Sequence, residues 1–257
     1  MGKIIQFFKK EFKPVFFYNI FIDCVVGILF GMIAKYGSSK IEPYHMEIPH
    51  GDQNPNNMFS YEKDTVSGDN CFIIGYVPLG ILIIICSIIK KSPMFFIQAS
   101  ITALLSLTTG LMGVNLGKKF AGRPRPHFWD RYQTNPTSKS LYQSFPSGHS
   151  ECIFNGMTFT MLFLAGQFKL FSKKGQESWK IAICVIPFVV AFMVTITRTR
   201  DHFHHYTDII GGSLIGFVSA LAVYCSKFCS LFGEHSSDVK MAHTKEYEQD
   251  TENPFDV

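Results

Sequence analysis

The stretch CFIIGYVPLGILIIICSII, residues 71–89, contains no charged side chain. A helix of this length rises about 30 Å, which matches the hydrocarbon core of a bilayer, and it satisfies its own backbone hydrogen bonds. The stretch is therefore predicted to be a transmembrane helix. The composition of the chain agrees, because 47% of its 257 residues are hydrophobic and only 17% are charged, against about 25% in soluble domains.

The same length criterion predicts five further spans, and with them an all-α integral membrane bundle of six transmembrane helices. The six predicted spans are 15–34, 71–89, 94–116, 150–168, 181–198 and 207–231. Buried helices of a soluble core are the alternative, which would have to place six such stretches in one short chain. The spans divide the chain into a cytoplasmic N-terminal segment 1–14, a core 15–231, and an acidic, disordered cytoplasmic tail 232–257.

Lysines mark one side of this predicted bundle. If the spans alternate in direction, that side receives the following lysines: Lys3, Lys9, Lys10, Lys13, Lys90, Lys91, Lys169, Lys173, Lys174 and Lys180. The positive-inside rule predicts that this side is cytoplasmic, in an endomembrane or the plasma membrane, and that the other side is lumenal or extracellular. The N-terminus lacks a short apolar core with a cleavage site, so no removable signal peptide is expected.

All five arginines lie on the opposite side, in or near three polar clusters that the alternation of spans brings to one face. The clusters read KKFAGRPRPH at 118–127, SFPSGHS at 144–150 and TRTRDHFHHYTD at 197–208. The arginine fork matches phosphate oxygens in pairs and lysine adds a point charge, so Lys118, Arg125 and Arg198 are expected to clamp an oxyanion. Basic charge in an apolar body indicates a phosphate or anionic lipid rather than nucleic acid.

Two further groups carry the expected chemistry. Ser147 and Gly148 open the fourth span, where backbone N–H groups and the helix dipole can meet an anion, with His149 beside it. His204 and Asp208 are four residues apart and share one helical face, and a carboxylate on one ring nitrogen leaves the other nitrogen basic. His204 is therefore the candidate nucleophile.

Some neighbours compete with these assignments. His205 could also reach Asp208, at a spacing of three residues. Arg123 begins a second Arg-Pro pair, but the spacing from Lys118 selects Arg125 for the clamp. His127 is expected to be a polar loop residue rather than a ligand.

Two acids inside the predicted spans have simpler interpretations. Asp23 lies within the first span and is expected to make a structural hydrogen bond. Glu151 is expected to favour the start of its helix, although its closeness to His149 could tune that group.

Three motifs of the chain resemble, in order and spacing, the three-part signature of the type 2 phosphatidic acid phosphatase superfamily: Lys118-x6-Arg125-Pro126, Pro146-Ser147-Gly148-His149 and Arg198-x5-His204-x3-Asp208. The longer stretches GRPRPHF and SFPSGHS look like its lipid phosphate phosphatase branch, and EKDTV at 62–66 is similar to a segment in the first loop of that branch. The resemblance covers about residues 15–231. Thr197 departs from the serine usual there, but it keeps the hydroxyl group.

This resemblance implies hydrolysis of a lipid phosphate, such as phosphatidic acid, lysophosphatidic acid or diacylglycerol pyrophosphate, without a metal or other cofactor. It implies that His204 attacks phosphorus to form a phosphohistidine, that Asp208 orients His204, and that His149 protonates the leaving alcohol and then activates water. The groups that would stabilise the transition state are Lys118, Arg125, Arg198, Ser147 and Gly148.

Other functions fit the same motifs. The substrate could be an isoprenyl diphosphate, a sphingoid-base phosphate or a sugar phosphate. The chain could also be a catalytically silent lipid-binding or transport relative, although such relatives lose key His or Arg residues that are all present here. The tripeptide Asn253-Pro254-Phe255 resembles the ligand of endocytic adaptor domains, which makes an adaptor a candidate partner beside the lipid substrate and the membrane lipids.

Overall fold

The computed structural model describes residues 14–47, 55–171 and 177–240, with side chains from residue 17. Six long helices make up most of it: α2 (Pro14–Met32), α4 (Gly68–Lys90), α5 (Pro93–Ala121), α7 (Gly148–Gln167), α8 (Ser178–Arg200) and α9 (Tyr206–Lys227). Five short helical segments connect them: η1 (Ile33–Gly37), α3 (Ser38–Lys40), η2 (Pro55–Asn57), α6 (Phe128–Thr134) and η3 (Lys139–Tyr142). The described residues contain no strand, only one isolated bridge between Phe228 and Val239, so the all-α prediction is confirmed.

Five helices of the described chain are long and apolar enough to cross a membrane: Phe17–Lys40, Gly68–Lys90, Pro93–Ala121, Ser178–Arg200 and Tyr206–Lys227. The sixth long helix, α7, does not reach the same hydropathy. It packs against α4, α5, α8 and α9, and 15 of its 20 residues are buried. Because other helices surround it, α7 can carry polar side chains that lipid would exclude.

Glycines let the neighbouring helices approach α7 closely. A Cβ atom on Gly156 of α7 would come within 2.4 Å of the Gly75 carbonyl oxygen of α4. On the other side, a Cβ atom on Gly216 of α9 would come within 2.4 Å of the Glu151 carbonyl oxygen. Small residues at such crossings allow backbone contact between membrane helices, so they fix α7 between its neighbours.

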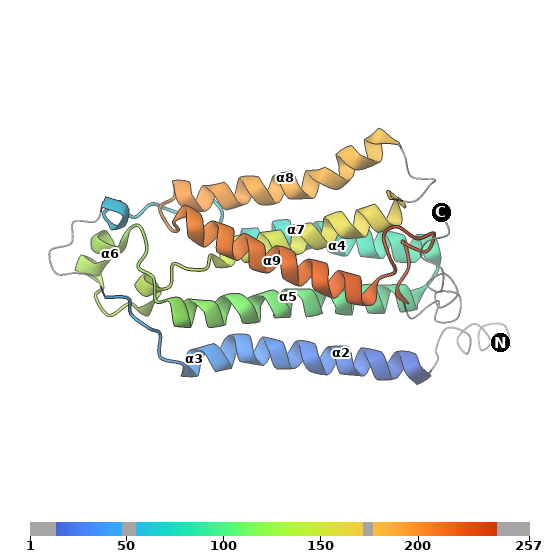
Figure 1. Ribbon diagram of the computed structural model, residues 1–257, viewed down its shortest axis with the longest axis horizontal. Coiled ribbons are helices and arrows are strands. Elements are labelled where there is room, and N and C mark those ends of the chain that lie inside the picture. Colours follow the sequence, from blue (N-terminus) through green and yellow to red (C-terminus); the bar gives the residue numbers. More distant parts are fainter. Residues whose placement is uncertain (1–13, 48–54, 172–176, 241–257) are drawn as a thin grey trace.

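The polar clusters lie together at one end of the bundle. The end of α5, the start of α7, the end of α8 and the start of α9 meet there, as alternating spans predict, while the start of α2 and the end of α9 lie toward the other end (Figure 1). Gly122 ends α5 with a φ of +55°, and a Cβ atom on it would lie 2.1 Å from the Tyr44 carbonyl oxygen. Glycine is needed at this turn, which leads the chain from α5 into the Arg123–Arg125 segment.

The opposite end of the bundle is closed by ion pairs and by residues 228–240. Asp23 of α2 is buried and pairs with Lys227 at the end of α9, which confirms the structural bond expected of this acid. Lys90 at the end of α4 pairs with Asp238 at 2.6 Å. The first part of the predicted tail, 232–240, is thus in contact with the bundle, whereas Asn253-Pro254-Phe255 lies outside the described residues.

Candidate active site

Three cations from different segments converge at the end of the bundle where the polar clusters lie. Lys118 is in the last turn of α5, and its Nζ atom would be 3.3 Å from a Cβ atom on Gly148, so it lies against the start of α7. Arg125 follows in the loop, where its Nε donates to the Ser140 carbonyl oxygen at 2.9 Å. Burial and the nearby Arg198 lower the pKa of Arg125 to about 10, which leaves it charged at neutral pH.

Arg198, in the last turn of α8, is 1% exposed. Its Nη2 atom forms an ion pair with Asp64 at 2.8 Å, and its Nη1 atom donates to the Val66 carbonyl oxygen at 3.1 Å. Its Nε atom has no hydrogen-bond partner among the described residues. The Phe203 ring lies 4.5 Å from this guanidinium and 5.7 Å from that of Arg125, so the two arginines flank one aromatic ring.

The start of α7 supplies backbone donors to the same place. Ser147 is the buried N-cap residue, and its Oγ atom accepts from the Ser150 N–H at 3.4 Å. Because α7 begins at Gly148, the N–H groups of Gly148 and His149 have no partner within the helix. The Nε2 atom of His149 is buried and has no partner in the part of the chain that the structure describes. These groups can therefore receive an anion at the positive end of the helix dipole.

His204 precedes α9 and is 4% exposed. Its Nδ1 atom lies 2.7 Å from the Ser144 carbonyl oxygen and 3.8 Å from Oδ2 of Asp208. Since a carbonyl can only accept, Nδ1 carries the hydrogen and Nε2 keeps a free lone pair. Burial lowers the pKa of His204 to about 3, and the charges of Arg125 and Lys118 act in the same direction against the Asp208 carboxylate. The ring is neutral at physiological pH, which suits a nucleophile.

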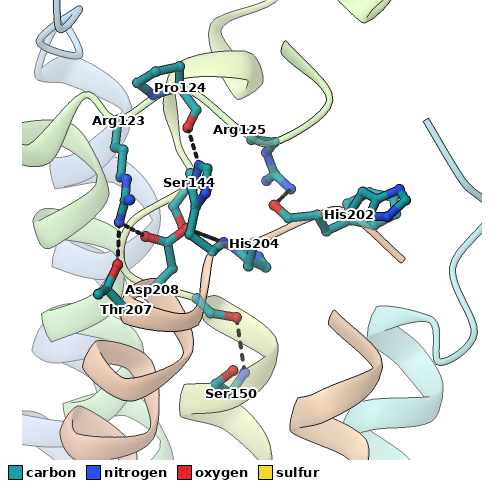
Figure 2. A network of polar contacts seen from close by, with 12 residues as sticks. Arg123, Pro124, Arg125, Ser144, Ser150, His202, His204, Thr207 and Asp208 are labelled. Carbon is teal, nitrogen blue, oxygen red and sulfur yellow. Dashed lines mark hydrogen bonds and ion pairs between the residues drawn. The ribbon is translucent and has the colours of Figure 1, made fainter. Parts of the chain in front are cut away.

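Asp208 is fully buried and accepts several hydrogen bonds (Figure 2). Its Oδ1 atom pairs with Nη1 of Arg123 at 2.7 Å. Its Oδ2 atom accepts from the Ser144 hydroxyl at 2.5 Å and from the His205 N–H at 2.9 Å. The direct partner of the His204 ring is thus Ser144, and the carboxylate acts on the ring at longer range.

The competing residues occupy separate positions. Arg123 contacts Asp208 and the Thr207 hydroxyl. The Nε2 atom of His205 lies 3.2 Å from the Pro124 carbonyl oxygen, and burial lowers the pKa of this ring. Arg123 and His205 are thus each bound to residues of the loops or of α9.

His127 lies in the loop before α6, as expected, but it is buried. It is 3% exposed, and its ring lies edge-on to Tyr61 and Phe203, with centroids 5.2 and 5.1 Å away. Its Nδ1 atom is 2.8 Å from the His202 carbonyl oxygen. Burial lowers its pKa to about 4, so the ring is neutral at physiological pH. His127 is therefore a structural residue that packs against these two aromatic rings.

A cavity of about 280 Å³ opens beside Arg125, among the loops beyond the helix ends. It is lined by Tyr61, Arg125, His127, Arg131, Asn135, Ser138, Ser140, Leu141 and Phe203. Because Arg125 lines the cavity and Phe203 contacts both Arg125 and Arg198, the cavity adjoins the three cations.

Within the described residues, no three His, Cys, Asp or Glu side chains gather as a metal site would require. Glu151 lies in the first turn of α7, where an acid can favour the start of the helix. Its carboxylate is fully buried, and neither oxygen has a hydrogen-bond partner in the described part of the chain.

Three contacts at the candidate site involve residues to which the sequence assigned no role. Ser144 acts through its main-chain carbonyl, which any residue has, and only its place in the SFPSGHS stretch could have drawn attention to it. Phe203 contacts two clamp arginines from the position just before His204. Asp64 lies in the EKDTV stretch, which the sequence flagged without assigning a role.

Residues 99–230 match the family described as the PAP2 superfamily. A PA-phosphatase related-family protein of Dictyostelium discoideum is 34% identical over 157 residues, which are 60% of this chain and 58% of that protein. Lipid phosphate phosphatase 1 of Arabidopsis thaliana is 32% identical over 183 residues, 61% of this chain and 54% of that protein.

A probable diacylglycerol pyrophosphate phosphatase 1 of Schizosaccharomyces pombe is 33% identical over 171 residues, 59% of this chain and 61% of that protein. The chain therefore spans between about half and three-fifths of the length of these relatives. No solved structure matches the chain significantly.

Proposed function

Because the chain belongs to the PAP2 superfamily, we propose that it is a membrane-embedded phosphatase of lipid phosphates. Relatives named lipid phosphate phosphatase and diacylglycerol pyrophosphate phosphatase support this substrate class. The proposed substrates are phosphatidic acid, lysophosphatidic acid and diacylglycerol pyrophosphate. The products are orthophosphate and a lipid alcohol such as diacylglycerol, or phosphatidic acid from the diphosphate.

In the proposed reaction, the phosphate group binds between the three cations and the start of α7. The free lone pair on Nε2 of His204 attacks phosphorus, the bond from phosphorus to the lipid oxygen breaks, and His149 gives that oxygen a proton. Water then gives a proton to His149 and attacks the phosphohistidine, the phosphorus–nitrogen bond breaks, and orthophosphate leaves. The proposed route uses no metal.

The same groups stabilise the charge that develops on the phosphoryl oxygens. Arg125 and Arg198 donate in pairs, Lys118 adds a point charge, and the backbone N–H groups that follow Ser147 complete the set. These donors are already in place before substrate binds, since they are held by helix ends and by buried contacts. Such preorganisation is the main source of rate enhancement expected of this site.

We propose that α7 crosses the membrane as the sixth span, within a core of 15–231. Its 20 residues rise about 30 Å, and four of the five apolar helices pack around it. The acyl chains of the substrate remain in the bilayer while the phosphate reaches the helix ends, and orthophosphate leaves through the 280 Å³ cavity. The lysine-rich side is cytoplasmic and the active site is lumenal or extracellular, in an endomembrane or the plasma membrane.

The observation that carries this proposal is the neutral His204, with Nε2 free, beside three cations and a helix N-terminus. The test is phosphate release by the protein purified in detergent, with EDTA, from phosphatidate, lysophosphatidate, diacylglycerol pyrophosphate, an isoprenyl diphosphate and a sphingoid-base phosphate. We expect His204→Ala to abolish release and the exposed His45→Ala to leave it unchanged. Release that survives His204→Ala would contradict the mechanism, and the preferred substrate identifies the lipid class.

A further inference from the structure

The loop that precedes α4 reaches across the end of the bundle to Arg198. The Asp64 carboxylate pairs with Nη2 of Arg198 at 2.8 Å, and the Val66 carbonyl oxygen accepts from Nη1 at 3.1 Å. Both far nitrogens of the guanidinium are thus bound by one short segment, 134 and 132 residues away along the chain. Arg198 itself is 1% exposed, so these partners have replaced water around it.

A second contact pins the same segment to the turn that follows α8. The Thr65 N–H and the Thr65 hydroxyl donate to the two carboxylate oxygens of Asp201, at 2.7 and 2.6 Å. Asp201 is buried, and its Oδ2 atom lies 3.9 Å from Nη1 of Arg198. Asp64 and Thr65 therefore give the segment two separable attachments, one to Arg198 and one to Asp201.

The described residues leave one edge of the Arg198 guanidinium without a protein partner. Its Nε atom is buried and has no hydrogen-bond partner in the described part of the chain. The Phe203 ring lies 4.5 Å from the guanidinium carbon and limits where the plane can turn. With Nη1 and Nη2 each bonded to the loop, the guanidinium has a fixed orientation, and Nε is the one of its three nitrogens that has no partner among the described residues.

The negative charge of Asp64 is a second reason to assign this residue a role at the site. Three cations gather where the substrate's phosphate would bind, and their mutual repulsion grows as burial removes water. Asp64 makes the shorter of the two ion pairs of Arg198 in the described residues, at 2.8 Å against 3.9 Å for Asp201, and its side chain is still 36% exposed. It can therefore hold Arg198 without itself filling the phosphate position.

We propose that Asp64 is a positioning residue of the active site, which holds Arg198 so that its Nε edge faces the transferring phosphoryl group. The proposal rests on the proposed function, because it assigns Arg198 to that phosphate. The loop before α4 is then a part of the active site that none of the three motifs contains. Asp64 acts through Arg198 and does not touch the substrate.

The test compares two variants of Asp64 with two controls. Asp64→Ala removes the partner of Arg198, and Asp64→Asn keeps an acceptor oxygen without the charge. Thr65→Val removes the hydroxyl that donates to Asp201, which is the other attachment of the segment. Asp69→Ala removes an exposed acid five residues from Asp64. For each variant in detergent, kcat and KM for a lipid phosphate are measured together with the binding of orthovanadate, which mimics five-coordinate phosphorus.

Asp64→Ala is expected to lower kcat and weaken vanadate binding by roughly tenfold or more, with KM changed less, because an oxyanion donor acts mainly in the transition state. Asp64→Asn should recover part of both losses, while Thr65→Val and Asp69→Ala stay within about twofold of wild type. In an Arg198→Ala background, Asp64→Ala should weaken vanadate binding no further.

Three results would overturn the proposal. Wild-type vanadate affinity in a folded Asp64→Ala protein would show that Arg198 needs no help, and tighter binding would show that Asp64 competes with the phosphate. An equal loss in Thr65→Val would show that Asp64 only fastens the loop. A protein that binds vanadate in an Asp64-dependent way but hydrolyses no lipid phosphate would instead refute the proposed function alone.

Discussion

The imidazole of His204 is held by the main chain of Ser144, with Nδ1 2.7 Å from the carbonyl oxygen. The nearest Asp208 oxygen is 3.8 Å away, and that carboxylate instead binds the Ser144 hydroxyl, the Arg123 guanidinium and the His205 N–H. Ser144 thus links the acid to the ring through its own backbone. The acid fixes the segment that orients His204, and its charge acts on the ring only through space.

This geometry predicts that a substitution of Asp208 lowers kcat less than a substitution of His204 does. Asp208→Asn should lower kcat by about 10²-fold, which is less than the ~10⁴-fold loss expected where a carboxylate directly accepts the ring N–H. His204→Ala should abolish turnover, and Ser144→Ala, which keeps the carbonyl, should lower kcat by only a few fold. The measurement is steady-state phosphate release by variants with wild-type elution in detergent. A ~10⁴-fold loss in Asp208→Asn would mean that the acid contacts the ring directly during turnover.

Arg123 and Arg125 are two residues apart and offer a matched pair. Arg125→Gln removes a clamp donor, so orthovanadate binding and kcat should each fall about 10²-fold or more. Arg123→Gln removes the ion pair to Asp208 at 2.7 Å and leaves the clamp intact, so vanadate binding should change by less than about threefold while kcat falls about tenfold. Equal losses of vanadate affinity in the two variants would place Arg123 in the phosphate site.

The sequence was most informative where a residue type itself carries the chemistry. Arg and Lys at helix ends, and a glycine at the start of a helix, predicted the candidate phosphate site, and alternating spans predicted that these helix ends meet, as they do (Figure 1). The partner of His204 could not be predicted, because the Ser144 carbonyl has no residue-type signal. Asp64 could not be paired with Arg198, since an acid in a polar loop carries no periodicity that would give its position.

Hydropathy also has a physical limit in this bundle. Hydropathy measures how well a helix suits lipid. The side chains of α7 instead meet four other helices, which surround it. Its polar residues therefore lower its hydropathy below that of the five apolar helices. The burial of His127 could not be predicted for a related reason, because Tyr61 and Phe203 enclose a ring that stands in a loop sequence.

The buried ring of His204 makes stability depend on pH in a defined direction. Its pKa is about 3 in the folded protein and about 6.5 in an unfolded chain. Between these values the unfolded chain binds a proton that the folded chain excludes, so stability falls as pH falls through this window and is constant above it.

The measurement is the thermal midpoint in detergent at pH values between 7.5 and about 4.5. The wild-type midpoint should fall more steeply below about pH 6.5 than that of His204→Gln, with the exposed His45→Gln as the matched control. Parallel curves for wild type and His204→Gln would show that the ring is accessible to protons in the folded state.

The contact between α9 and the start of α7 predicts that one methyl group can disable the site. A Cβ atom on Gly212 would lie 2.2 Å from the carbonyl oxygen of Ser147, the N-cap of α7. Backbone cannot move aside as a flexible side chain can, so Gly212→Ala must push α9 from the donors that follow Ser147, and a 1 Å misplacement lowers kcat about 10²-fold. Gly80→Ala is the control, since nothing lies within 4 Å of its Cβ position. It should keep full activity and gain up to about 1 kcal/mol in stability, and a fully active Gly212→Ala protein would contradict the proposed role of this helix contact.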